Sequence, residues 1–377
     1  MAVVVIMQNN AAADGCEFNR AMPGIHHLAS ETGHGIQLPD NMPRATPAMM
    51  GWLAVMLAGG QPDAVRWDPG WPEGYLVALG SGLDCDPSLT WGVLLLSHLR
   101  QHRDQLVFDH NPKERNTGTE VMEYLATLAP PFAELGWRIY PGDGDSMVLS
   151  TTRECQVDVQ PLQHLHGKSL QTVLPQGKGA GMLLTLMTTG QLILARSETN
   201  SRRIQRGLPP MNTPWIQGVA RGDTFFDRNR IASPSGSYWC SDTVASGLGR
   251  HEGWTRLPWT APASTREADS WESWQGLATL AAQAAANGPV LLQFSIANTP
   301  MLTHIGHTVI QPLVQLLGNA HQELLLVVQE TGRDGQNWSW GFGRGKQLLA
   351  KKRFWRPRTW GQGSVLTLER AREFWLS

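Results

Sequence analysis

The sequence predicts an α/β protein into which a smaller α+β domain is inserted. Apolar, strand-like runs at Ala2 to Met7, Val290 to Phe294 and Leu324 to Val328 are separated by helical patterns. Strands that alternate with helices indicate a mainly parallel sheet with helices on both faces. Between Tyr75 and Asp158, short strand-like runs are mixed with one helical pattern, which indicates the inserted α+β domain.

Two helical patterns lie in the first half of the chain. Pro47 to Leu57 carries an apolar surface made largely of methionine and leucine. From Gly118 to Leu128, apolar residues recur at helical spacing. We expect a helix in each segment, the second one within the insert.

A long helical pattern runs from Lys178 to Gln205 and then stops. Gly207 can close the helix in the left-handed conformation, and Pro209 and Pro210 cannot continue it. Because a residue before proline favours extended backbone, we expect a new strand to follow. We interpret this point as the return of the chain from the insert to the larger domain.

Long loops are expected from Arg221 to Ser270, a segment rich in Gly, Ser, Trp and Pro. Beyond it, helical patterns at Trp271 to Ala286 and around His307 to Leu317 alternate with the last two predicted strands. This order completes the predicted α/β domain.

Composition narrows the class of protein. The chain has 377 residues, enough for two domains, and a net charge of −1 with 17% charged residues, which suggests no dominant electrostatic partner. Its four cysteines stand far apart without a Cys-x-x-Cys pair, so neither a zinc knuckle nor a disulfide framework is indicated. No stretch approaches the roughly 20 apolar residues of a membrane span. We expect a soluble, cytoplasmic protein without membrane association or cofactor.

The segment from Arg206 to Gly218, which begins Arg-Gly-Leu-Pro-Pro-Met-Asn-Thr-Pro-Trp, resembles the linker of one enzyme family. This is the cofactor-independent phosphoglycerate mutase family of archaeal type, including mutase-like bacterial proteins of unassigned role. Tyr75 to Asp86 looks like the strand and Gly-rich turn that open the family's inserted domain, and Phe132 to Thr152 is similar to its next strand pair. The resemblance implies an alkaline-phosphatase-like α/β domain around the insert.

Together the patterns and the resemblance predict five segments. Residues 1–74 form the first part of the phosphatase-like domain, and 75–175 form the inserted domain. Residues 176–207 form the linker helix, 208–335 the second part of the phosphatase-like domain, and 336–377 a basic, Trp-rich tail.

The resemblance also implies where catalytic ligands belong, and this chain departs from the family there. Phosphoryl transfer in this superfamily uses two metal ions, which require many Asp and His ligands. The first strand is followed by Gln8, Asn9 and Asn10 in place of a metal-binding Asp. The nucleophile position holds Thr46-Pro47 in place of Ser-Asp.

The later ligand positions depart as well. Pro300 and His304 stand where the family has Asp and His, and Glu330-Thr331 replaces a final Asp-His pair. The chain keeps only scattered candidates for a catalytic site, namely Thr46, Asp63, His304 and Glu330. We therefore predict no metal site and a scaffold that has lost its phosphotransfer centre.

A second group of possible metal ligands lies within the insert, namely His98, His102, Asp104, Asp109 and His110. On a helix, His98 and His102 would be one turn apart and able to bind one ion. The group lies far from the place where the family has its metal pair. We interpret it as a solvated polar face.

The C-terminal tail is a basic patch, because Gly335 to Leu368 contains no acidic residue. The candidate binding residues are Arg344, Lys346, Lys351, Lys352, Arg353, Trp355, Arg356, Arg358 and Trp360. Aromatic rings that stack on bases beside cations that neutralise phosphates suit single-stranded nucleic acid. Trp and Arg are also enriched at protein interfaces, and a plain solvated tail is a third interpretation.

Three functions from different classes remain open. The leading hypothesis is a non-catalytic, mutase-like protein that binds an unidentified protein partner or ligand in a regulatory role. The second is a metal-dependent phosphoglycerate mutase or phosphatase with an altered site. The third is a nucleic-acid-binding accessory protein that uses the C-terminal tail.

Overall fold

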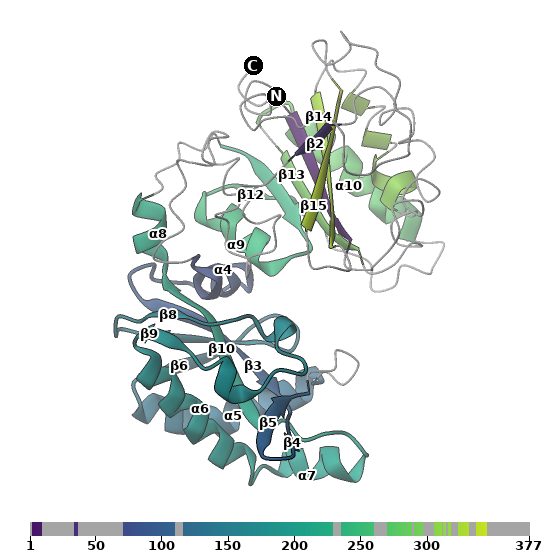
Figure 1. The fold of residues 1–377 in the computed structure, drawn as a ribbon. Coiled ribbons are helices and arrows are strands. Elements are labelled where there is room, and N and C mark those ends of the chain that lie inside the picture. The colour runs from purple at the N-terminus through teal and green to yellow at the C-terminus, as the bar shows by residue number, and fades with distance from the viewer. Residues whose placement is uncertain are drawn as a thin grey trace. The chain divides into compact units, whose positions relative to one another are not determined.

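The chain forms two compact units in the computed structural model (Figure 1). Unit 1 is Met1–Val65 with Ile231–Ser377, and unit 2 is Arg66–Arg230. The structure describes residues 2–9, 34–36, 71–109, 116–228, 235–259, 270–288, 290–296, 305–310, 312–313, 316–317, 323–331 and 337–344. The predicted helix at 47–57 lies outside these residues.

Unit 1 contains a seven-stranded sheet in the order β12-β11-β13-β1-β14-β15-β2. Its strands are β12 (Thr255–Arg256), β11 (Ser237–Cys240), β13 (Val290–Ile296), β1 (Ala2–Asn9), β14 (Glu323–Thr331), β15 (Asn337–Arg344) and β2 (His34–Ile36). The strands from β12 to β14 pair in parallel, whereas β15 and β2 are antiparallel. The predicted α/β class is confirmed, but among the described strands parallel pairing is confined to this part of one sheet.

Strands and helices also occur where long loops were predicted. Within 221–270 lie α8 (Gly222–Arg228), β11, α9 (Thr243–His251) and β12. The loop prediction is wrong because Gly, Ser and Trp suggest loops in composition, while local signals favour regular structure. Asp242 is such a signal, since its carboxylate accepts a hydrogen bond from the Ala245 N–H at 2.9 Å and caps α9.

The start of the predicted tail is also a strand. β15 pairs antiparallel with β14 over its whole length. In its sequence Asn-Trp-Ser-Trp-Gly-Phe-Gly-Arg, large aromatic residues alternate with small ones, which is the period of a strand. The tail prediction rested on the basic residues and did not use this alternation.

Four aromatic rings pack together in the core of unit 1. The ring of Trp239 lies 5.2 Å from that of Phe294 and 4.8 Å from that of Trp259. Trp274, on α10 (Ser270–Ala284), completes the cluster at 4.7 Å from Trp259. Large rings of this kind bury much apolar area, so the cluster ties α10 to β11 and β13. The π-helical turn η5 (Gly306–Ile310) packs on the same core in the region of the predicted second helix.

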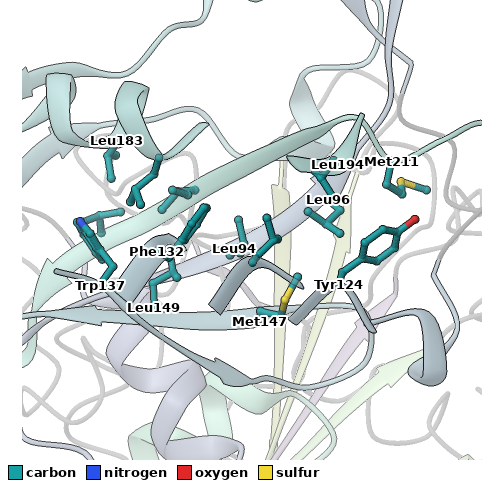
Figure 2. Close-up of a cluster of buried hydrophobic side chains, with 14 of the residues drawn as sticks. Leu94, Leu96, Tyr124, Phe132, Trp137, Met147, Leu149, Leu183, Leu194 and Met211 are labelled. Carbon is teal, nitrogen blue, oxygen red and sulfur yellow. The ribbon is translucent and has the colours of Figure 1, made fainter. Parts of the chain in front are cut away.

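Unit 2 is built on a four-stranded antiparallel sheet in the order β10-β3-β7-β6. Its strands are β10 (Thr213–Arg221), β3 (Thr90–Ser97), β7 (Met147–Thr151) and β6 (Arg138–Pro141). Helices α5 (Gly118–Glu134) and α6 (Ala180–Leu194) pack on this sheet around buried Phe132, Trp137 and Leu183 (Figure 2). Smaller elements complete the unit, namely β4 (Leu99–His102), β5 (Gln105–Phe108), β8 (Gln156–Asp158), β9 (Gln176–Lys178), η3 (Leu162–His164) and η4 (Leu170–Thr172).

The segment that opens this unit is a helix and not the strand that the resemblance implied. Helix α4 (Glu73–Gly80) buries every residue from Gly74 to Leu79. A side chain on Gly74 would meet the Cα of Gly92 in β3 at 2.4 Å, so the helix approaches the strand closely there. A short apolar run buried on all sides has no period that separates helix from strand.

The predicted linker helix is two helices, α6 and α7 (Glu198–Gln205). Gly207 has φ +74° and closes α7, and the Leu208 N–H donates to the Arg203 carbonyl at 2.9 Å, as in a Schellman motif. The strand that follows is β10, and it pairs with β3 of unit 2. The division of the chain therefore falls near residue 230, after β10, whereas we predicted the return at 208.

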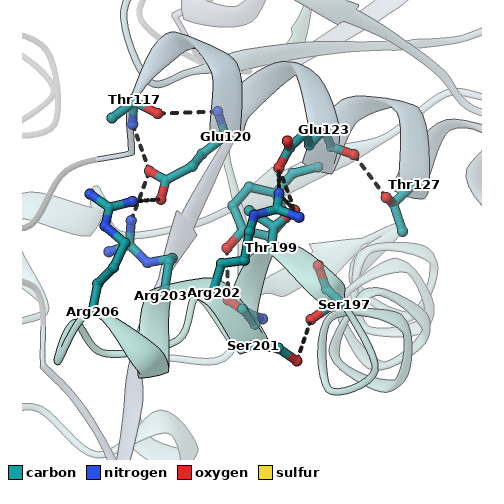
Figure 3. Close-up of polar contacts among 12 residues, drawn as sticks. Thr117, Glu120, Glu123, Thr127, Ser197, Thr199, Ser201, Arg202, Arg203 and Arg206 are labelled. Carbon is teal, nitrogen blue, oxygen red and sulfur yellow. Dashed lines mark hydrogen bonds and ion pairs between the residues drawn. The ribbon is translucent and has the colours of Figure 1, made fainter.

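A buried ion pair joins α5 to α7 (Figure 3). Arg203 is fully buried, and its Nη1 lies 3.0 Å from Oε2 of Glu120. Its Nε donates to the Pro209 carbonyl at 3.0 Å, which fixes the turn after α7. Arg206 contacts the other oxygen of Glu120 at 3.2 Å, and Thr117 completes a capping box with that residue.

Two asparagines hold the chain that follows this turn. Asn200 donates to the carbonyls of Leu194 and Met211 at 2.8 and 2.9 Å and accepts from the Met211 N–H at 2.8 Å. Asn212 accepts from the Leu99 N–H at 2.7 Å and donates to the Leu99 carbonyl at 2.9 Å. The Pro-Pro-Met-Asn segment is thus fixed to α7 and to β4 by side-chain amides.

The ion pair predicts a large cost for removing its cation. Arg203→Met leaves the buried Glu120 carboxylate with the exposed Arg206 as its described cationic partner, so the free energy of unfolding should fall by about 3 kcal/mol. The control is Arg202→Met, because Arg202 pairs with Glu123 at the surface and should cost less than about 1 kcal/mol. Urea denaturation measures the free energy of unfolding of both variants. Equal losses would contradict a larger contribution from the buried pair than from the surface pair.

The same pair predicts a pH dependence. Burial acts to raise the pKa of Glu120, but hydrogen bonds from Thr117 and the Arg203 guanidinium outweigh it and leave the pKa below its ordinary value. A lowered pKa stabilises the fold above the unfolded value of about 4.3, and this contribution is lost as the pH falls through the folded value. Unfolding across acidic pH should show a steeper loss of stability for the native protein than for Glu120→Gln, and parallel curves would contradict this.

Candidate functional site

The carboxyl ends of three neighbouring parallel strands meet at one edge of the unit 1 sheet. Asn9, the last residue of β1, lies opposite Ile296 of β13 and Glu330 of β14. One residue earlier, Gln8 lies opposite Ser295 and Gln329. Open α/β sheets bind their ligands at this edge. It is therefore the candidate functional site of the chain.

A polar cluster stands where β11 ends and α9 begins. Gln293 of β13 is fully buried, and its Oε1 accepts from the Asp242 N–H at 2.8 Å and from the Ser241 hydroxyl at 3.3 Å. The Asp242 carboxylate caps α9. We did not identify this cluster from the sequence, although Ser-Asp-Thr before an apolar helix is a recognisable start signal.

The cysteine beside this cluster is not a reactive thiol. Cys240 ends β11 and is buried. Burial raises its pKa well above the ordinary value, and the nearby Asp242 acts in the same direction. Because the thiolate is the form that attacks or binds metal, Cys240 is a packing residue.

The described strand ends offer few of the ligands that a binuclear metal centre requires. Two divalent ions at a phosphotransfer site need a cluster of carboxylates and imidazoles. Within the described part of the chain, no three His, Cys, Asp or Glu side chains come together as a possible metal site. At the aligned strand ends, the sequence supplies amides, one hydroxyl and the single carboxylic acid Glu330.

The structure places one of the four catalytic candidates. Glu330 lies at the carboxyl end of β14, between Asn9 of β1 and Trp338 of β15 in the backbone register. Thr46, Asp63 and His304 lie outside the described residues.

One tail candidate, Arg344, is placed at the end of β15, opposite Leu324. The remaining candidates also lie outside the described residues, namely Lys346, Lys351, Lys352, Arg353, Trp355, Arg356, Arg358 and Trp360. The tail as a binding surface stays a prediction.

The described members of the histidine group lie in and beside the hairpin of β4 and β5, and no helix presents them. His110 lies outside the described residues. His98 follows β3, with its Nδ1 2.9 Å from the Pro210 carbonyl, and His102 ends β4. Asp109 lies 3.2 Å from Arg100 and 3.8 Å from His166. The helical spacing that suggested two ligands for one ion does not apply here.

None of the helices in the described residues is long and apolar enough to cross a membrane.

Known proteins were compared with the chain by sequence and by fold. No family model matches the chain. It is 29% identical over 139 residues to the 2,3-bisphosphoglycerate-independent phosphoglycerate mutase of Methanothrix thermoacetophila, which covers 36% of this chain and 34% of that protein. It is 32% identical over 124 residues to a probable mutase of the same kind from Geobacter sulfurreducens, covering 33% and 31%. The matched segment spans about a third of the length of these curated relatives.

Solved structures match over the whole chain. The PH0037 protein of Pyrococcus horikoshii has a TM-score of 0.61 at 15% identity and covers 100% of this chain and 96% of that one. The cofactor-independent phosphoglycerate mutase of Thermoplasma acidophilum has a TM-score of 0.53 at 14% identity and covers 100% and 98%. The resemblance predicted from the linker is thus confirmed: the chain is a divergent relative of the cofactor-independent phosphoglycerate mutases and shares their fold.

Proposed function

We propose that this protein is a non-catalytic relative of the phosphoglycerate mutases that acts by binding a partner or ligand, in a regulatory role. The observation that carries the proposal is the alignment of Gln8 and Asn9 with the ends of β13 and β14. Strand ends that lie beside one another offer amides where two metal ions would need anionic ligands. An amide is a weak ligand for a divalent cation and does not offset its charge.

The arrangement at β11 supports the same proposal. Asp242 is the carboxylate nearest in sequence to that strand end, and its oxygen is engaged in capping α9. Gln293 is engaged in holding the backbone of the same turn. These hydrogen bonds give both groups a part in holding the scaffold, which supports the proposal.

The proposal predicts that the purified full-length protein binds no stoichiometric manganese or zinc and hydrolyses no phosphate ester in a metal-dependent way. Metal analysis and a hydrolysis screen with 3-phosphoglycerate and p-nitrophenyl phosphate measure this, with the Methanothrix mutase assayed in parallel. Added Mn²⁺ should leave the melting temperature unchanged, because a ligand that binds the native state would raise it.

The second candidate function, an altered phosphotransfer site, has its own signature. Turnover that is abolished by a chelator and by either Thr46→Ala or Glu330→Gln would establish it and overturn the proposal. Hydrolysis that resists the chelator and survives both substitutions would rule out this candidate site.

The tail remains the candidate for nucleic-acid or partner binding. β15 pairs with β14, so a deletion that begins at Asn337 would remove a sheet strand together with the tail. Neutralising Lys351, Lys352, Arg353 and Arg356 to glutamine is therefore the cleaner change. If the tail binds single strands, this variant should lose salt-sensitive binding while its thermal stability is unchanged.

A further inference from the structure

Helix α6 contains no charged residue among its 15 positions, although it lies on the outside of unit 2 (Figure 1). One of its faces packs on the core through Leu183, Leu186 and Leu194. A helix at the surface of a globular protein normally turns charged residues to the water, whereas a helix without them is normally covered on all sides. α6 thus has the composition of a covered helix, with one face exposed.

The exposed face of α6 has a regular spacing. Its residues lie alternately four and three positions apart along the helix and its C-cap, namely Gly181, Thr185, Thr188, Leu192 and Ala195. This heptad spacing is the one at which two helices pack along each other. Leu192 is 67% exposed, the highest value among the large apolar side chains of the described residues. We call these five residues the α6 seam.

Two glycines of α6 differ in what accounts for them. A Cβ on Gly190 would meet Cγ of Pro214 at 2.6 Å, so the packing of unit 2 itself requires glycine there. A Cβ on Gly181 would meet nothing within 4 Å. Glycine is a poorer helix former than alanine, so no contact among the described residues accounts for Gly181. The close approach of a second helix would account for it.

We propose that the α6 seam binds the α6 seam of a second copy of this chain, in an antiparallel pair centred on Thr188. Leu192 of one copy then lies beside the partly buried Leu184 of the other, and Ala195 lies on Gly181. Large side chains face small ones in this register, as ridges fit into grooves. A two-fold axis requires such a self-complementary surface. The inference concerns unit 2 and holds whatever the activity of the sheet edge in unit 1.

Charge favours a second copy as the occupant. The start of α6 carries Lys178 with Glu154 at 3.1 Å, and the exposed Arg196 and Glu198 follow its end. An antiparallel pair brings the start of one helix to the end of the other, so both signs are present on each side and the helix dipoles are opposed favourably. Helix pairs between different proteins are commonly selected by charges beside the seam. α6 offers none.

Sedimentation velocity of the full-length protein from about 1 to 100 µM tests the pairing. A helix of 15 residues is about 22 Å long and gives a small interface, so we expect a monomer–dimer equilibrium with a Kd of about 10 µM. Because the seam is uncharged, the dimer should persist in about 1 M salt. A protein that stays monomeric throughout this range would overturn the proposal, as would a dimer that dissociates in high salt.

Variants locate the interface. Thr188→Glu sets two carboxylates against each other at the axis and should raise the Kd at least about tenfold. Gly181→Leu should do the same by filling the space that Ala195 of the second copy needs. In a dilute sample its melting temperature should be preserved, because the new side chain meets nothing in its own chain. The control, Ala126→Glu, adds a carboxylate at an exposed position of α5 and should leave the dimer intact. A dimer that resists both seam variants, or that the control also dissociates, would refute the interface.

A cysteine at the axis tests the register. Helices packed at about 8 Å bring facing residues close enough for a disulfide, whose Cα atoms lie about 4.4–6.8 Å apart. Mild oxidation should therefore link Thr188→Cys into covalent dimers and leave the native protein and Ala126→Cys unlinked. Failure of Thr188→Cys to link in a protein that sediments as a dimer would exclude antiparallel pairing about Thr188 and overturn the proposal.

Discussion

The buried contact between Arg203 and Glu120 is the interaction on which much of unit 2 depends. It neutralises a guanidinium that has no exposed surface and joins the first turn of α5 to the last turn of α7. The same guanidinium holds the Pro209 carbonyl, so it also fixes the direction in which the chain leaves α7. Because a buried charge without its partner is costly, the turn, the two helices and the start of β10 are stabilised together.

From this turn, side-chain amides continue the constraint. Asn200 binds the backbone of Met211, and Asn212 occupies the edge of β4 at Leu99. The motif that identified the family is thus a structural element whose polar residues satisfy backbone groups.

The corrections share one physical cause. Strands β1, β13 and β14 of unit 1, the α5 helix and the closure of α7 at Gly207 followed from apolar periodicity and glycine geometry, which are local. α4 was read as a strand because its run is buried on all sides, and β10 was assigned to the other domain because its partner β3 lies far away in sequence. At the candidate site, the sequence predicted that Gln8 and Asn9 follow the first strand in place of a metal-binding Asp. Gln293 and Asp242 were missed because their role appears only in hydrogen bonds between distant segments.

By itself the sequence determined the α/β class, the relation to the mutases and the unusual residues at the ends of β1 and β14. These depend on residue type and on order along the chain. Tertiary structure alone decided that Asn9 and Glu330 are neighbours and that β10 completes the sheet of unit 2. Each of these depends on strand pairing between distant segments, because backbone hydrogen bonds across a sheet leave no trace in local periodicity.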